Sequence, residues 1–231
     1  MRPKYIIRGR KMEISTSILN VKDEDAIQTF YRLETVHTDY FHIDIMDGKF
    51  VKKDTAEAMK KYADCIKNIT NIPLEVHLMV DNVKKYVDMM APCEPSIIMF
   101  HIESTKNKQE TIDMIKYIKD SNCKVGLVVN PETSIENVFE YLPFIHQVMV
   151  MTVHPGEGGQ ELIPETIEKV RKLKNYIDEN NYEVDIEVDG GITLDNLQEL
   201  ADAGANIASI GTYMINAKDY KYTMNKLKSI N

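Results

Sequence analysis

The sequence predicts an α/β protein that folds as a single (β/α)8 barrel, and three observations lead to this prediction. Short apolar segments alternate regularly with amphipathic ones along the 231 residues, which gives eight expected strands and eight expected helices. Apolar strands between amphipathic helices require a parallel sheet that is covered on its faces, and eight such units favour closure into a TIM barrel. No Gly-x-Gly-x-x-Gly motif follows the first strand, so an open dinucleotide-binding sheet is the weaker alternative.

The expected strands are short runs rich in β-branched and aromatic residues that stop at glycine, proline or polar residues. Asn130-Pro131, for example, closes the fifth strand because proline lacks the N–H that strand pairing needs. We expect the strands over 12–19, 40–46, 73–79, 96–102, 123–129, 147–153, 183–189 and 206–211.

The expected helices are segments in which apolar residues recur at helical spacing, as Ala26, Phe30 and Leu33 do in the first of them. Thr193 has the side chain of a helix N-cap, and Gly204 can end the same helix in a left-handed conformation. We expect the helices over 23–36, 55–68, 83–90, 108–120, 135–141, 164–179, 193–203 and 219–229.

Composition limits the classes of partner. The chain is 43% hydrophobic and 28% charged, and its net charge of -8, without a stripe of Lys and Arg between aromatics, argues against a nucleic-acid partner. No apolar run approaches the roughly 20 residues of a membrane span. Three scattered cysteines, at 65, 93 and 123, suit a reducing cytosol, so we expect a cytoplasmic protein. Assembly into a homo-oligomer is left open.

The first eleven residues form a separate segment at the sequence level. Residues 1–11 contain five basic residues and no acidic one, and their apolar stretch is too short for the core of a signal peptide. We expect a disordered basic tail over 1–11, which could be a tag, an extension or a mis-assigned start. The barrel domain is expected over 12–231.

Polar residues gather at the ends of three expected strands. On the strand over 40–46, alternation places His42 and Asp44 on one face and apolar residues on the other. His-x-Asp alone is more often a hydrogen-bonded pair than a metal site, but His77 and Asp189 fall near the ends of two further strands. Because barrel active sites lie at the carboxyl ends of strands, the four side chains are candidates for one site. His101 is expected to be structural or to support a ligand.

Glycines follow the last three expected strands, where such barrels usually bind phosphate. Glycine allows backbone N–H groups to approach an anion closely, and a helix N-terminus adds a favourable dipole. A single glycine-rich turn is usually only a tight turn, whereas three at consecutive strand ends exceed what turns require. The candidate phosphate-binding residues are Gly156, Gly158, Gly159, Gln160, Gly190, Gly191, Gly211 and Thr212.

At five strand ends the chain resembles the ribulose-phosphate 3-epimerases, through the motifs at 16–19, 42–51, 76–80, 151–160 and 188–192. The resemblance implies that His42, Asp44, His77 and Asp189 bind one divalent ion, which could be zinc, ferrous iron, manganese or cobalt. It also implies that Asp44 and Asp189 are the acid–base catalysts. Further substrate contacts would come from Ser17, Met46, His77, Met79 and Met151.

The implied reaction is epimerisation at carbon 3 of a ketose phosphate. Removing a proton on one face and returning one on the other requires two carboxylates on opposite sides of the substrate. The motifs favour D-ribulose 5-phosphate, which would become D-xylulose 5-phosphate. The segments 40–48, 130–133 and 211–212 resemble the allulose-6-phosphate 3-epimerases instead, so D-allulose 6-phosphate is the alternative substrate.

Two departures from the family pattern lie at the expected rim. Lys52-Lys53 replaces the usual Pro-Asn, and Glu157 replaces an aromatic residue. A carboxylate near phosphate would repel it, so Glu157 must face solvent, pair with a lysine or mark another ligand. A decarboxylase of the orotidine-phosphate type would need a lysine where the chain has Ile45 and Met46. A catalytically silent sugar-phosphate sensor is the remaining alternative.

Overall fold

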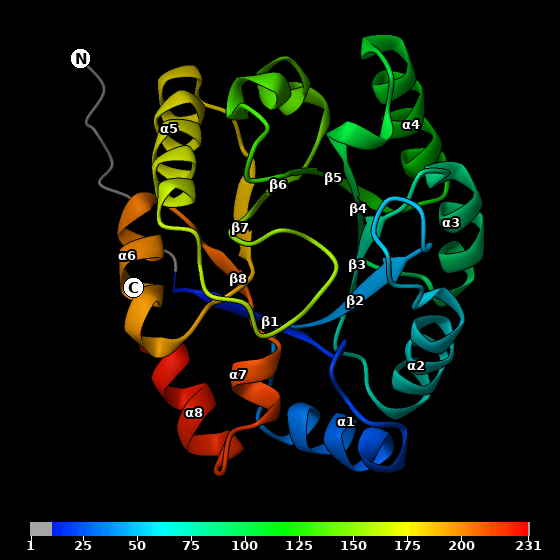
Figure 1. Ribbon diagram of the computed structural model, residues 1–231, viewed down its shortest axis with the longest axis vertical. Coiled ribbons are helices and arrows are strands. Elements are labelled where there is room, and N and C mark those ends of the chain that lie inside the picture. Colours follow the sequence, from blue (N-terminus) through cyan, green and yellow to red (C-terminus); the bar gives the residue numbers. More distant parts are fainter. Residues whose placement is uncertain (1–10, 231) are drawn as a thin grey trace.

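The computed structural model describes residues 11–230, which contain a closed barrel of eight parallel strands in sequential order (Figure 1). In Figure 1 the strands lie in the middle and the helices surround them. The predicted (β/α)8 fold is therefore confirmed. The strands are β1 Glu13–Ser17, β2 Tyr40–Met46, β3 Leu74–Met79, β4 Ile97–His101, β5 Lys124–Val129, β6 Gln147–Met151, β7 Asp185–Asp189 and β8 Ile207–Ser209.

Helices follow the strands with two departures from expectation, of which the first is an additional short helix, α7 Thr212–Ile215. The segment expected as a helix over 135–141 is a 3-10 helix, η4 Ile135–Phe144, which contains Pro143. Proline cannot donate the backbone hydrogen bond of a longer α-helix and clashes with the preceding turn. The α-helices are α1 Ala26–Thr35, α2 Ala56–Ile69, α3 Val83–Met90, α4 Lys108–Asp120, α5 Glu165–Asn180, α6 Leu194–Ala203, α7 Thr212–Ile215 and α8 Tyr220–Leu227.

The predicted ends of α6 are confirmed in atomic detail. Thr193 accepts a hydrogen bond from the backbone of the first turn, and the backbone N–H of Thr193 donates to the side-chain oxygen of Asn196, which completes a capping box. Gly204 ends the helix with a φ of 115°, a conformation that residues with a Cβ rarely adopt. This helix starts shortly after β7, so its capping fixes the loop that carries the glycines at 190 and 191.

The core has two layers that follow from strand alternation. Phe41, Ile43 and Ile45 of β2 are fully buried in the large cluster between the strands and the helices, where Phe30 of α1 meets Phe41 edge to face. A smaller apolar cluster, which includes Met99 of β4, forms separately from it. The residues between the outward-facing ones on β2 are therefore free to face the barrel interior.

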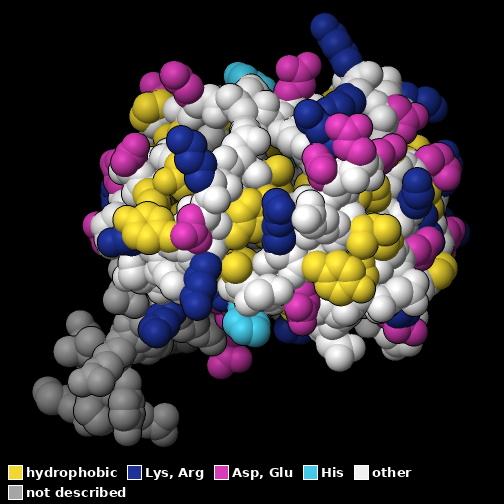
Figure 2. All heavy atoms as spheres, turned by 90° about the horizontal axis from the view of Figure 1, so that it is seen from below, with side chains coloured by type: hydrophobic (Ala, Val, Ile, Leu, Met, Phe, Trp, Pro, Cys, Tyr) yellow, Lys and Arg dark blue, Asp and Glu magenta, His cyan; other side chains and the backbone are white. Residues whose placement is uncertain are grey.

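Three expectations concern the N-terminal tail, membrane-spanning helices and the distribution of surface charge. The expected tail over 1–11 lies outside the described residues except for Lys11, so its boundary stays a prediction. Within residues 11–230, the helices are all too short or too polar to cross a bilayer. On the face seen in Figure 2, acidic and basic side chains are interspersed, with hydrophobic side chains between them.

Candidate active site

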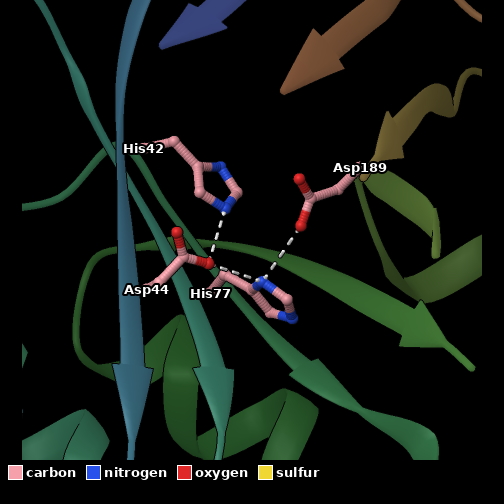
Figure 3. Close-up of side chains that lie close together, drawn as sticks. All are labelled: His42, Asp44, His77 and Asp189. Atoms are coloured by element: carbon pink, nitrogen blue, oxygen red, sulfur yellow. Dashed lines mark hydrogen bonds and ion pairs between the residues drawn. The ribbon is translucent and has the colours of Figure 1, made fainter. Parts of the chain in front are cut away.

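Four side chains from three strands converge inside the barrel mouth, as Figure 3 shows. Asp44 Oδ1 lies 3.3 Å from His42 Nε2 and 3.2 Å from His77 Nδ1. His77 Nδ1 lies 3.7 Å from Asp189 Oδ2. One candidate ligand atom from each of the four residues lies within 4.8 Å of the others. The structure thus brings together the four residues that the sequence analysis named as candidates for one site.

Strand register accounts for this convergence. In the parallel pairing of β2 with β3, Asp44 stands opposite His77, so both side chains leave the sheet at the same height. His42 lies two residues earlier on β2 and faces the same side. Asp189 is the last residue of β7 and approaches from another part of the barrel wall. The barrel interior is the only place where these directions meet.

The donor set fits a divalent metal ion. His42 Nε2 is buried and makes no hydrogen bond of good geometry, although Asp44 Oδ1 lies 3.3 Å away, and a buried polar atom in this position costs free energy. Nitrogen and oxygen ligands about 2.0–2.2 Å from a metal lie about 3.0–3.6 Å from one another, close to the separations found here. Two histidines and two carboxylates suit zinc, ferrous iron, manganese or cobalt. The structure therefore contains a candidate metal centre.

The electrostatics of the four groups differ. Burial alone would raise the pKa of Asp44, but contacts with His42 and His77 outweigh burial and hold that pKa below its usual range. Burial raises the pKa of Asp189, and the charge of Asp44 adds to this rise against the effect of His42. Burial also lowers the pKa of His77, which favours the neutral imidazole that binds metals. A divalent cation between the carboxylates would offset their repulsion.

Two further carboxyl groups lie beneath the site. His42 Nδ1 is 3.5 Å from Glu75 and 3.6 Å from Glu187, and Gln147 donates to both carboxyl groups. Burial, reinforced by Glu75, raises the pKa of Glu187 well above its usual range. Despite burial, hydrogen bonds from His42 and Ser15 lower the pKa of Glu75. The two pKa values therefore shift in opposite directions, which favours the ionised form of Glu75 and the protonated form of Glu187.

A cavity of about 250 Å³ opens above the four residues. Of the predicted substrate contacts, His77 is the exception, because it is fully buried and does not line this cavity. All the others line it, together with both catalytic candidates: Ser17, Asp44, Met46, Met79, Met151, Gly156, Gly158, Gly159, Gln160, Asp189, Gly190, Gly191, Gly211 and Thr212.

The glycine-rich end of the cavity is closely packed. Gly191 has a φ of 66°, and a Cβ there would lie 2.4 Å from the backbone nitrogen of Leu162. A Cβ on Gly158 would lie 2.3 Å from Asn20, whose amide donates to Thr212 Oγ1 at 2.8 Å. Among the described residues, the side chains lining this cavity include neither Lys nor Arg. A phosphate group would therefore depend on neutral donors.

The structure shows where the two departures from the family pattern, Glu157 and Lys52-Lys53, lie. Glu157 lines the cavity mouth and is exposed, so of the three alternatives the structure supports the solvent-facing one. Gln160 closes its loop by donating to the carbonyl oxygens of His154 and Glu157. Lys52 and Lys53 are exposed and do not line the cavity.

Several residues at the site escaped the sequence analysis. Glu75 and Glu187 each precede a site residue by two positions on the same strand, so strand alternation was a usable signal for both. Asn20 gave no such signal, because its partner Thr212 is 192 positions away in sequence. His101 was expected to be structural or to support a ligand, and its ring does contact His77.

The comparisons with known proteins agree with the fold and identify the family. Curated relatives named ribulose-phosphate 3-epimerase include those of Escherichia coli K12, with 34% identity over 83% of each chain, and Helicobacter pylori J99, with 32% identity over 95% of this chain and 98% of the relative. The relative from Aquifex aeolicus is 36% identical over 83% of this chain and 84% of its own.

Solved structures share the fold at low identity. The 3-hexulose-6-phosphate synthase of Salmonella typhimurium superposes with a TM-score of 0.68 and 12% identity over 95% of this chain and 98% of its own. Thiamine phosphate pyrophosphorylase of Pyrococcus furiosus gives a TM-score of 0.64 and 15% identity over 96% of each chain. A model of the ribulose-phosphate 3 epimerase family matches residues 13–215. The chain therefore belongs to the ribulose-phosphate 3-epimerase family.

Proposed function

We propose that the protein is an isomerase that interconverts D-ribulose 5-phosphate and D-xylulose 5-phosphate by epimerisation at carbon 3. The observation that carries the proposal is the placement of two carboxylates, Asp44 from β2 and Asp189 from β7, at one cavity beside two histidines. Their separate origins in the barrel wall suit the two faces of a substrate lying between them. The names of the family relatives support the same reaction.

The two aspartates would exchange protons with opposite faces of carbon 3. In the direction that starts from one epimer, one carboxylate removes the proton and the other carboxylic acid returns a proton to the opposite face. Ser17 donates to Asp44 Oδ2 at 2.7 Å and so fixes the orientation of that carboxylate. When bound by the two histidines and two aspartates, a divalent ion would supply positive charge beside the oxygens of the enediolate.

The rest of the cavity would hold the substrate and limit water. Met46, Met79 and Met151 line the cavity beside the aspartates, where their apolar side chains exclude water from the reacting carbons. At the other end, the backbone N–H groups of Gly190, Gly191 and neighbouring residues would receive the phosphate. The substrate would therefore bridge an acidic, metal-binding end and a neutral end of the same cavity.

The location of the protein, the identity of its metal and its oligomeric state are separate from this reaction. We propose a cytoplasmic location on the basis of three free cysteines among the described residues, which suits a reducing compartment. The choice among zinc, ferrous iron, manganese and cobalt, and assembly into a homo-oligomer, remain predictions from the sequence. Metal analysis of the purified protein and light scattering would decide them.

The test is a kinetic comparison of two substrates with the purified, metal-loaded protein. We expect a higher kcat/KM for D-ribulose 5-phosphate than for D-allulose 6-phosphate, the alternative that the sequence left open. Solvent deuterium should appear at carbon 3 of the product, because the returned proton comes from a carboxyl group that exchanges with water. Turnover of neither sugar phosphate by metal-loaded protein would refute the proposed function.

A further inference from the structure

A third histidine lies directly behind the candidate metal centre. His101 ends β4 and is fully buried, and its Nε2 atom lies 2.9 Å from Nε2 of His77. The two ring planes are 25° apart, and their centroids are 5.0 Å apart. This centroid separation is close to the N–N distance plus the radii of the two rings, so the rings meet head to head. One ring therefore donates a hydrogen bond to the other almost within the ring planes.

The far side of His101 faces a carboxylate. Its Nδ1 atom lies 3.3 Å from Glu103 Oε2, and Glu103 Oε1 accepts the backbone N–H of Asn130 at 2.9 Å. Asn130 follows β5, so these contacts join the ends of two neighbouring strands. Both oxygens of Glu103 are thereby engaged. An ionised carboxylate can only accept hydrogen bonds, and this property determines where the protons of the row must be.

The proton positions follow from one end of the row to the other. His77 Nδ1 faces Asp44 and Asp189, so it is the atom that would bind a metal and must be unprotonated. The proton of a neutral His77 is then on Nε2, from which it is donated to His101. His101 accepts at Nε2 and therefore carries its own proton on Nδ1, which donates to Glu103. When a metal occupies Nδ1 of a neutral His77, this arrangement satisfies every contact of the row.

We propose that His101 and Glu103 are positioning residues that hold His77 in the tautomer and orientation needed to bind the metal. The inference rests on the proposed function only in taking the four-residue cluster as a metal site. A hydrogen bond from the remote nitrogen of a ligating histidine fixes its ring and increases its basicity, and loss of such a partner typically weakens metal binding. His101 relays this support from Glu103, which does not touch the cavity.

Packing alone does not explain the row. The ring of Phe50 packs on His101 with centroids 4.7 Å apart, and an apolar side chain at 101 would serve this contact better. The other candidate ligand, His42, has carboxyl partners of its own at longer range, because its Nδ1 lies 3.5 and 3.6 Å from Glu75 and Glu187. The shorter, in-plane contact is on the His77 side. Each candidate histidine ligand thus has polar groups behind it, and the row through His101 is the one behind His77.

The test is Glu103→Gln, which keeps the shape of the side chain but replaces one acceptor oxygen with a donor. The single amide oxygen of the variant cannot take the place of both carboxylate oxygens, which accept from Asn130 and His101, so the row loses its fixed proton order. We expect cobalt(II) affinity, measured by competition with a chromogenic chelator on metal-free protein, to fall about 10- to 100-fold. The visible absorption of the bound cobalt(II) should also shift. Thermal unfolding of the metal-free variant reports on folding separately.

Glu132→Gln is the matched control. Glu132 Oε1 lies 2.9 Å from His154 Nδ1 in an exposed pair at the rim, so the same substitution removes a histidine partner that does not face the metal centre. Cobalt(II) affinity and absorption should remain those of the unmodified protein. If Glu103→Gln folds and also leaves both unchanged, the proposed support of His77 is wrong.

A measurement on the unmodified protein keeps the inference testable even if Glu103→Gln does not fold. In the zinc-loaded protein with ¹⁵N-labelled histidine, NMR should place the proton of His77 on Nε2 and that of His101 on Nδ1. A proton on Nε2 of His101 would overturn the proposal. Both experiments omit the sugar phosphate, so the inference can fail while epimerase activity is present. Conversely, if the protein has no epimerase activity but Glu103→Gln still weakens cobalt(II) binding, only the proposed function is refuted.

Discussion

The two sides of the barrel mouth differ in charge and in the kind of segment that forms them. On one side, β2 and β3 hold His42, Asp44 and His77 on rigid strands, and all three are buried. On the other side, the loops after β6, β7 and β8 present glycines and neutral side chains to the same cavity. Charge that changes during the reaction faces titratable groups, whereas the constant charge of a phosphate would face backbone dipoles.

The difference shows where precision is needed. A proton transfer depends on the position of two atoms, and strands paired on both sides hold side chains more firmly than loops do. A phosphate presents oxygens in several directions, so closely packed backbone N–H groups suffice for it. Changes to the titratable groups on strands, which include Asp189 at the end of β7, should therefore affect kcat most, and changes in the glycine-rich loops should affect KM most.

The largest effect is expected from removal of the metal. Without a cation, Asp44 and Asp189 face each other as like charges, and the pKa of Asp189 is already raised by burial and by Asp44. Exhaustive chelation should abolish turnover, and addition of a divalent ion should restore it. Metal content and kcat are measured on the same samples. Full activity of protein that contains no bound metal would contradict this prediction.

A large effect on kcat is expected from Asp44→Asn and Asp189→Asn. Each variant keeps an oxygen for the metal but cannot accept a proton, so epimerisation should fall by about 100- to 10,000-fold. Metal content is the control, because weaker metal binding would mimic the loss.

Solvent exchange separates the roles of the two aspartates. The remaining base in each variant can still exchange the proton on its own face, so one variant should exchange mainly one epimer and the other variant the opposite one. Deuterium incorporation at carbon 3 is followed by NMR for each epimer. If both metal-containing variants exchange the same epimer, a single base serves both faces.

On the loop side, Gly191→Ala should mainly raise KM. The new Cβ would meet backbone atoms of Leu162 and would force alanine into a left-handed conformation that costs about 1–2 kcal/mol. The loop should shift, and kcat/KM should fall by about 10- to 100-fold, mostly through KM. Steady-state kinetics with D-ribulose 5-phosphate measure this change.

Gly204→Ala is the matched control for that variant. Gly204 also has a positive φ, of 115°, but it ends α6 and does not line the cavity. Both variants should unfold at lower temperature, whereas only Gly191→Ala should change KM. Equal KM values for the two variants would mean that the glycine-rich end does not hold the phosphate.

The smallest effect is expected from Glu157→Phe. Glu157 is exposed at the mouth, so an aromatic side chain there should change the reach of the cavity by little. We expect the ratio of kcat/KM values for ribulose 5-phosphate and allulose 6-phosphate to rise by about fivefold or less, the lower end of the roughly 1–3 kcal/mol that a methylene-sized change in a pocket is worth. An unchanged ratio would show that the side chain at 157 only faces solvent.

The sequence by itself determined the barrel, the order of its elements and the strand ends that carry the site. Alternation along β2 placed His42 and Asp44 on one face, and this local rule needs no knowledge of distant residues. The capping of α6 by Thr193 and Gly204 was equally local. The segment after β5 was correctly predicted to be helical, but its helix type was wrong. The periodic stretch that indicated a helix ends before Pro143, so the prediction did not take this proline into account.

Only the tertiary structure decided which polar groups meet inside the barrel. The register of β2 against β3 sets Asp44 beside His77, and closure of the barrel brings Asp189 to both. The row from His77 through His101 to Glu103 depends on rotamers and on neighbouring strand ends, which no periodicity encodes. Contacts between strands depend on shear and closure, which are properties of the assembled sheet as a whole.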